Sequence, residues 1–186
     1  MRIILKQAPI IYLLFNIQYL FAYNICDANM INASKNYNVP LPILYAVSMT
    51  EAGLKQTIQP YALNIDGKAI FPKTKKEALL IISKAKKDGA KYIDVGCMQI
   101  NELYHGKHFA SVADMLDPKL NINYAAQFLK NLYKKQKSWT IAVARYHTGD
   151  RHSLEQKKYI CKVIKNLVAT GFGGSIKESA RFCSNL

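Results

Sequence analysis

The chain has 186 residues, of which 50% are hydrophobic, and a formal net charge of +14. This length suits one domain with a substantial core, and the hydrophobic content excludes an intrinsically disordered chain. The positive charge favours an anionic partner, which could be a nucleic acid, an acidic membrane face or an acidic polymer.

The first stretch has the pattern of an export signal. Arg2 and Lys6 form a basic start, and residues 10–23 form an apolar run that is too short to span a bilayer comfortably. Small residues allow cleavage after Ala28, with Ala22 as an alternative site. We therefore predict a signal peptide over residues 1–28 and a soluble periplasmic protein without a membrane span after cleavage. An uncleaved membrane anchor is the second interpretation.

Residues 40–53 predict a central helix, with prolines in its first turn, apolar side chains on most of its sides and Gly53 at its end. Glu51 is the only carboxylate of this helix and lies at the mouth of an apolar segment. Partial desolvation favours the protonated form of a carboxyl group, which can then act as a general acid. The alternative is an ordinary solvated residue at a helix end.

The elements that follow predict a mainly α fold, of the α+β type, with a small β-hairpin. Asp66-Gly67 is a turn signal for a hairpin over residues 61–71. Thr74 and Glu77 form a capping box for a helix that runs to about Asp88. A third short strand is expected at residues 91–95. Further helices are expected at residues 111–116, 121–137, 139–146 and from Ser153 to near Gly171.

The cysteines and histidines give no metal pattern. If Cys26 leaves with the signal peptide, Cys161 and Cys183 could join the C-terminal tail to the preceding helix, and Cys97 is expected to be a buried free thiol. The sequence does not settle this pairing. Neither residue type has the spacing of zinc ligands, so we expect no metal and no cofactor.

Two other stretches could act together with Glu51. In residues 96–101, a glycine allows close backbone approach, and Gln99 and Asn101 alternate with apolar residues so that their amides can point into a cleft. In residues 142–149, Tyr146 could bind the carboxyl group or a substrate hydroxyl, or it could be a core tyrosine whose hydroxyl reaches water.

Several ordered motifs resemble the soluble-lytic-transglycosylase-like domains, which have a lysozyme-like fold, and in particular the small members that accompany type III and type IV secretion or conjugation systems. The resemblance covers about residues 39–152, which we assign as the catalytic domain, with residues 153–186 as a C-terminal helix and tail. The motifs are residues 50–53, 60–67, 93–101, 121–129 and 139–146.

The resemblance implies that Glu51 is the catalytic acid and base. It also implies a glycan groove, with Tyr146 supporting Glu51. The residues assigned to substrate binding are Gln99, Asn101, Tyr146, Asn64 and Met98. Two positions depart from the family pattern. Ala52 stands where a serine is usual, so that Thr50 or water would have to replace its hydroxyl, and His147 stands where an asparagine is usual.

The implied reaction cleaves the β-1,4 bond between N-acetylmuramic acid and N-acetylglucosamine and forms 1,6-anhydromuramyl ends. It would open the peptidoglycan locally for a secretion or conjugation apparatus. The alternatives are a hydrolytic muramidase, in which Asp94 or Asp66 positions water, and a non-catalytic subunit that binds peptidoglycan. The export signal and the lack of a nucleic-acid motif count against a nucleic-acid binder.

Overall fold

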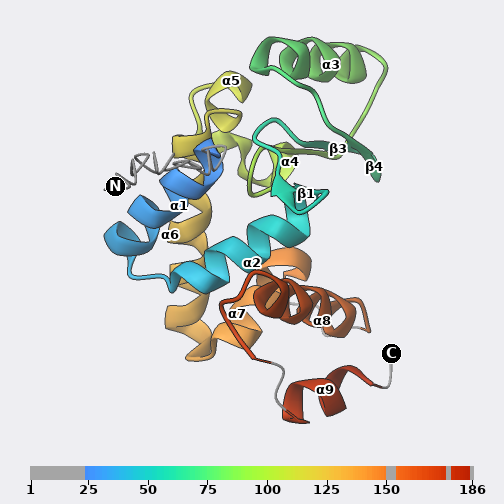
Figure 1. Cartoon of the computed structure of the whole chain (residues 1–186). Helices are drawn as coiled ribbons and strands as arrows, with labels where there is room; N and C mark the ends of the chain where they lie inside the picture. The colour runs from blue at the N-terminus through green and yellow to red at the C-terminus, as the bar shows by residue number, and fades with distance from the viewer. Residues whose placement is uncertain (1–23, 150–153, 175–176, 185–186) are drawn as a thin grey trace, which may run out of the picture.

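The computed structural model describes residues 24–149, 154–174 and 177–184, and helices make up most of this part of the chain. The helices are α1 (Ile25–Tyr37), α2 (Leu41–Ala52), α3 (Lys75–Lys87), α4 (Glu102–His105), the 3-10 helix η1 (Gly106–His108), α5 (Val112–Met115), α6 (Pro118–Gln136), α7 (Trp139–Thr148), α8 (Leu154–Ala169) and α9 (Lys177–Cys183). In Figure 1, α3 and the β strands lie toward one end of the molecule, α8 and α9 lie toward the other, and α2 passes between them.

The strands of the described residues form two small antiparallel sheets. One pairs β1 (Gly53–Leu54) with β2 (Thr57–Ile58). The other has the order β4-β3-β5-β6, and its strands are β3 (Leu63–Ile65), β4 (Lys68–Ile70), β5 (Ile93–Val95) and β6 (Ile100–Asn101). The predicted mainly α architecture with a small β-hairpin is therefore confirmed.

The central helix α2 forms where the sequence predicts it. Pro42 lies in its first turn, where a missing N–H costs no intrahelical hydrogen bond. Both α1 and α8 pack against α2, and its buried apolar side chains belong to the main core. Gly53 ends the helix in an extended conformation. A Cβ at this position would lie 2.2 Å from the carbonyl oxygen of Met49, so the close approach requires glycine. Glu51 consequently occupies the last turn of α2.

Helix α1 is an element that the sequence interpretation missed. It begins at Ile25, and the side chain of Asn24 caps it by accepting a hydrogen bond from the backbone N–H of Cys26. Cys26, Met30 and Ala33 are fully buried where α1 packs against α6 and α2. The segment from residue 24 to 28 is thus part of the folded domain, whereas residues 1–23 of the predicted signal peptide lie outside the described residues.

The other predicted elements appear with small shifts at their ends. The hairpin turns at Asp66-Gly67, where both residues have positive φ. Thr74 caps α3 by accepting a hydrogen bond from the N–H of Glu77. Helix α6 begins at Pro118, three residues before the predicted start, because Asp117 serves as its N-cap. The predicted cap of α8 at Ser153 lies outside the described residues.

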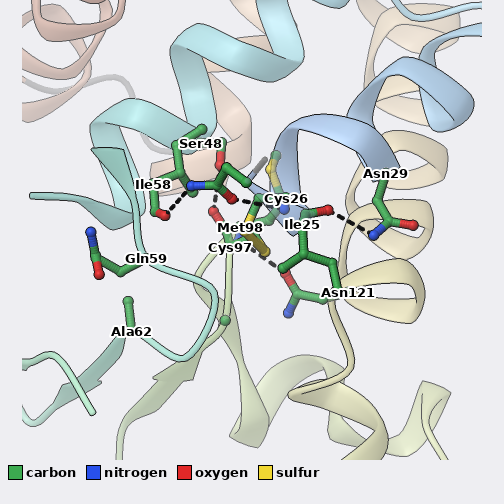
Figure 2. The surroundings of a disulfide bond; sticks show 12 residues. Ile25, Cys26, Asn29, Ser48, Ile58, Gln59, Ala62, Cys97, Met98 and Asn121 are labelled. Atoms are coloured by element: carbon green, nitrogen blue, oxygen red, sulfur yellow. Dashed lines mark hydrogen bonds between the residues drawn. A yellow bond between two sulfur atoms is a disulfide. The ribbon is translucent and has the colours of Figure 1, made fainter. Parts of the chain in front are cut away.

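Two disulfides replace the expected arrangement of cysteines. Cys161 and Cys183 join α8 to α9, as the sequence allowed. The expectation that Cys97 is a free thiol is wrong, since it is bonded to Cys26 of α1, as Figure 2 shows. The error arose because Cys26 was assigned to a removed signal peptide. Within the described residues, no helix has both the length and the apolar character needed to span a membrane.

Candidate active site

A cavity of about 1020 Å³ opens between the sheet and the helices, and its wall includes most of the residues that the sequence singled out. Glu51 contributes from α2, Asn64 from β3, Gln99 and Asn101 from the segment around β6, and Tyr146 from α7. These residues are far apart in the chain, so the fold alone brings them together. Cavities of this size with a few convergent polar groups are typical of ligand sites.

The carboxyl group of Glu51 is held by one hydrogen bond. Its side chain is 15% exposed, and its Oε1 atom accepts a hydrogen bond of 2.6 Å from the hydroxyl of Tyr159 on α8. Nδ1 of His147 lies 3.7 Å from the same oxygen, a distance at which it forms an ion pair only when it is protonated. Among the described residues, no hydrogen bond to Oε2 of Glu51 is formed.

Tyr159 is the functional residue that the sequence interpretation missed. Burial and the neighbouring carboxyl group of Glu51 raise the pKa of its phenol well above the ordinary value of 10, so Tyr159 remains a neutral donor. Its ring stacks in parallel on the ring of His147, with centroids 4.2 Å apart. The regular apolar pattern of α8 shows that this tyrosine faces inward, but it does not reveal the partner, which is 108 residues away.

The structure gives Tyr146 a different partner from the one expected. Its hydroxyl donates a hydrogen bond of 2.7 Å to the carbonyl oxygen of Met98, and burial together with nearby Glu51 raises its pKa well above 10. The single phenolic proton is therefore used on the segment around Met98, and the direct support that Tyr146 was predicted to give Glu51 comes from Tyr159. Tyr146 still forms part of the cavity wall.

The segment of residues 96–99, here called the cavity loop, is fixed in place by close packing against Asn121 of α6. Gly96 has φ +81°, and a Cβ there would lie 2.7 Å from Nδ2 of Asn121. The buried Asn121 side chain accepts from the N–H of Met98 and donates to the carbonyls of Val95 and Met115. This close packing explains why the position requires glycine.

The cavity loop also binds the helix that carries Glu51. The hydroxyl of Ser48, which is fully buried in α2, donates a hydrogen bond of 2.7 Å to the carbonyl oxygen of Cys97. The side chain of Cys97 is bonded to Cys26 of α1, so the loop lies between three helices, α1, α2 and α6, as seen in Figure 2. Glu51 and the loop are thereby fixed relative to each other.

The amide side chains do not all face the cavity in the same way. Gln99 has φ +45°, and its Nε2 atom donates to the carbonyls of Ala62 and Gly96. Oδ1 of Asn64 is buried and accepts no hydrogen bond from the described residues. An unpaired buried acceptor is costly, so Asn64 is well suited to accept a hydrogen bond from a ligand.

Asp94 is a second carboxyl group in the cavity wall. It lies on β5 and accepts a hydrogen bond of 2.7 Å from Nδ2 of Asn101. Burial raises its pKa above the ordinary value, the hydrogen bond from Asn101 opposes this shift, nearby Glu51 adds to it and His147 opposes it. Asp66, in contrast, accepts from the backbone N–H groups of Lys91 and Tyr92 and supports the hairpin turn.

Two other sequence expectations need correction. Met98 is fully buried, so its side chain does not contact a ligand in the cavity, and it contributes through its backbone. Ala52 is also fully buried. Thr50 does not replace the hydroxyl that is missing at Ala52, because Thr50 donates to the carbonyl of Ala46 and accepts from Asn166.

The mainly helical domain with small antiparallel sheets is consistent with a lysozyme-like fold, and its cavity is lined by carboxyl and amide groups. The chain matches the transglycosylase SLT domain family over residues 28–167, which is most of its length, and it therefore belongs to this family. Its members are lytic transglycosylases that act on peptidoglycan, and this chain is an enzyme of that class. No curated protein and no solved structure matches the chain.

Proposed function

We propose that this enzyme cleaves the β-1,4 bond between N-acetylmuramic acid and N-acetylglucosamine and leaves a 1,6-anhydromuramyl end. The observation that carries the proposal is Glu51, a mostly buried carboxyl group in the cavity wall that is held at one oxygen by Tyr159. In this proposal the other oxygen, which accepts no hydrogen bond from the described residues, meets the substrate. The positive charge of the chain suits a polymer that carries peptide carboxylates.

One carboxyl group suffices if the sugar supplies the nucleophile. Protonated Glu51 donates its proton to the glycosidic oxygen, and the bond from that oxygen to C1 breaks. The C6 hydroxyl oxygen of the muramic acid then bonds to C1, and the Glu51 carboxylate takes the proton that this hydroxyl releases. The enzyme is thus returned to its starting state, and no water is consumed.

The other residues of the cavity wall serve binding in this proposal. Gln99 and Asn101 would contact hydroxyl or acetamido groups of the glycan strand, and the unpaired Oδ1 of Asn64 would accept a hydrogen bond from it. Tyr146 would act mainly by holding the cavity loop through Met98. His147 stacks on Tyr159 and thereby limits the positions of the ring that holds Glu51.

Asp94 favours hydrolysis as a second candidate reaction. Glycoside hydrolysis commonly uses two carboxyl groups, one as acid and one as base or nucleophile. Asp94 lies in the same cavity as Glu51 and interacts with it electrostatically. In a muramidase, Asp94 would direct a water molecule to C1, and the product would have a reducing end.

Mass spectrometry of the muropeptides released from purified sacculi distinguishes these reactions. We expect the wild type to release anhydro products, Glu51→Gln to release none, and Asp94→Asn to keep the anhydro products. Reducing ends that disappear with Asp94→Asn would instead establish the muramidase. If the wild type binds sacculi but releases no soluble product, the chain has only a binding role.

We further propose that the enzyme acts in the periplasm and opens the wall locally for a secretion or conjugation apparatus. If the N-terminal segment is removed as a signal, cleavage after Ala22 keeps Cys26 and its bond to Cys97, whereas cleavage after Ala28 removes it. N-terminal sequencing of the exported protein should therefore give Tyr23 as the first residue. An active protein that begins at Asn29 would contradict this, and unchanged secretion or conjugation in cells with Glu51→Gln would contradict the proposed role.

A further inference from the structure

Helix α3 and the residues that flank it carry a large share of the positive charge of the chain. Residues 73–91 contain seven lysines and two acidic residues, which gives them a net charge of +5. The whole chain has a net charge of +14, so about a third of the excess lies in about a tenth of the residues. The charge is therefore concentrated at α3 beyond the basic composition of the chain as a whole.

Helix α3 buries only one of its sides. Ala78 and Ile82 are buried, and the helix lies at one end of the molecule in Figure 1, between β4 and β5 in the chain. The opposite side is formed by exposed residues at intervals of three and four, which a helix places above one another. These residues, here called the basic face, are Lys76, Leu80, Lys84 and Lys87.

The basic face presents net positive charge to the solvent. Asp88 pairs with Lys84 in an exposed ion pair, and the Glu77 side chain turns back to the helix cap, where it accepts a hydrogen bond from a backbone N–H. Among the described residues, no carboxyl group forms an ion pair with Lys76 or Lys87. The acidic residues of the segment thus leave both of these charges without a counter-charge.

Leu80 is the apolar centre of the basic face. It is 64% exposed, more than any other large apolar side chain of the described residues. A single exposed leucine is ordinary, but this one lies between lysines of the preceding and following turns. That combination suits the surface of an anionic bilayer, because the leucine can reach the acyl chains while the lysines extend their charged ends to the phosphates.

The type of cation also favours a lipid surface over a nucleic acid or a protein. All the cations of residues 73–91 are lysines and none is an arginine. Arginine is preferred where a phosphate or carboxylate is bound in a fixed geometry, and lysine is depleted at protein interfaces. In addition, a helix of 13 residues is only about 20 Å long. One of its faces is small compared with the roughly 800 Å² that each partner of a stable protein complex buries.

We propose that the basic face of α3 binds the surface of a bilayer that contains anionic phospholipids. The helix lies in the plane of the headgroups, as a peripheral contact, with Leu80 toward the acyl chains. The strands before and after α3, β4 and β5, belong to the sheet that lines the cavity of Glu51. The contact therefore holds the cavity close to the bilayer, whichever reaction is catalysed there.

Sedimentation of the full chain with vesicles tests the proposal. The apolar run of residues 10–23 could bind any bilayer. The measured quantity is therefore the gain in affinity from vesicles of phosphatidylcholine to vesicles of phosphatidylcholine and phosphatidylglycerol in equal parts. Lys76→Gln combined with Lys87→Gln should reduce this gain about twenty-fivefold, because each lysine near an anionic bilayer contributes about fivefold, which corresponds to about 1 kcal/mol. Leu80→Ala should reduce the affinity for the anionic vesicles about fivefold.

Matched variants on α8 serve as controls. Lys158→Gln combined with Lys162→Gln removes the same charge from two exposed positions. Leu154→Ala shortens a leucine that is 55% exposed. Both controls should have much smaller effects than the corresponding changes on α3. Because all the substituted side chains are exposed, the thermal midpoint should stay constant in every variant and exclude misfolding.

The outcomes also separate this surface from the reaction at Glu51. Equal losses for the lysine pairs of α3 and α8 would mean that binding follows the total charge, and this result would overturn the proposal. A chain that shows no gain on anionic vesicles would overturn it as well. The proposal is also wrong if the α3 changes leave vesicle binding intact but weaken binding to purified sacculi, DNA or an acidic protein. Muropeptide release by the same variants, measured in parallel, decides the proposed function independently of vesicle binding.

Discussion

Removal of the Cys26–Cys97 disulfide by the double substitution Cys26→Ala and Cys97→Ala should reduce both stability and activity. The two cysteines are 71 residues apart in the sequence. Closing a loop of this length restricts the unfolded chain by about 4 kcal/mol in the chain-entropy description. A domain with a typical free energy of unfolding of about 5–15 kcal/mol would lose a large part of it.

The expected loss of activity has a local cause. Cys97 belongs to the cavity loop, and its carbonyl accepts the hydrogen bond from Ser48 on the helix of Glu51. Without the disulfide, α1 is joined to this loop only by packing, and the loop can shift relative to Glu51. We therefore expect kcat on sacculi to fall in the double variant even at temperatures where it remains folded.

The second disulfide provides a matched control. Cys161 and Cys183 are 22 residues apart, which corresponds to about 3 kcal/mol in the same description. Helix α9 has no buried residue among those described, so it can detach while the core remains intact. The double substitution Cys161→Ala and Cys183→Ala should therefore cost less than this value and leave the activity unchanged.

Denaturant unfolding and release of muropeptides, each with and without a reductant, measure these differences. The wild type treated with a reductant should behave like the protein without the Cys26–Cys97 bond. Disulfides form in oxidising compartments and are rare in the reducing cytosol, so the enzyme should be fully active only under oxidising conditions. Equal stability losses for the two pairs, or full activity without the Cys26–Cys97 bond, would refute the reasoning.

Three further substitutions test the site. Tyr159→Phe removes the hydrogen bond to Glu51 and should lower kcat by about tenfold or more with little change in KM. Steady-state kinetics would measure both constants, and a change in KM alone would contradict a positioning role. Burial raises the pKa of Asp94, so its carboxyl group holds a proton more tightly in the folded state than in the unfolded chain. The protonated carboxyl group therefore adds stability at low pH, and this stability is lost as the pH rises through the folded pKa. Asp94→Asn keeps an acceptor for Asn101 and should flatten this fall in unfolding experiments above pH 4; an unchanged pH profile would show that Asp94 is not its source. Asn121→Ala removes the partner of three buried backbone groups, the N–H of Met98 and the carbonyls of Val95 and Met115, and should lower the free energy of unfolding by about 3 kcal/mol or more. A loss below about 1 kcal/mol would mean that water replaces the side chain.

The sequence predicts well those features that depend on neighbouring residues. The turn at Asp66-Gly67 and the cap at Thr74 require only short-range backbone geometry, and the structure has both. The alternation in residues 98–101 correctly puts Gln99 and Asn101 in the cavity wall. The same alternation buries Met98, so its assignment to the ligand went against the pattern.

The features that the sequence could not predict depend on distant contacts. The partner of Glu51 is Tyr159 rather than Tyr146, and no periodicity tells which of two inward-facing phenols reaches a carboxyl group 108 residues away. Helix α1 follows directly on a strongly apolar stretch, and its first residues resemble a cleavage site. This resemblance hid both the helix and the partner of Cys97.

The cavity loop explains how one mostly buried carboxyl group can be kept in position by residues that lie, apart from Tyr146, outside the cavity wall. Ser48 ties the loop to α2, Asn121 ties it to α6, the disulfide ties it to α1, and Tyr146 ties it to α7. Four helices therefore have to be assembled before Glu51 and Gln99 line the same cavity. Because packed elements transmit small shifts, changes at Asn121 or Cys26 should affect kcat as well as stability, although both side chains are buried outside the cavity wall.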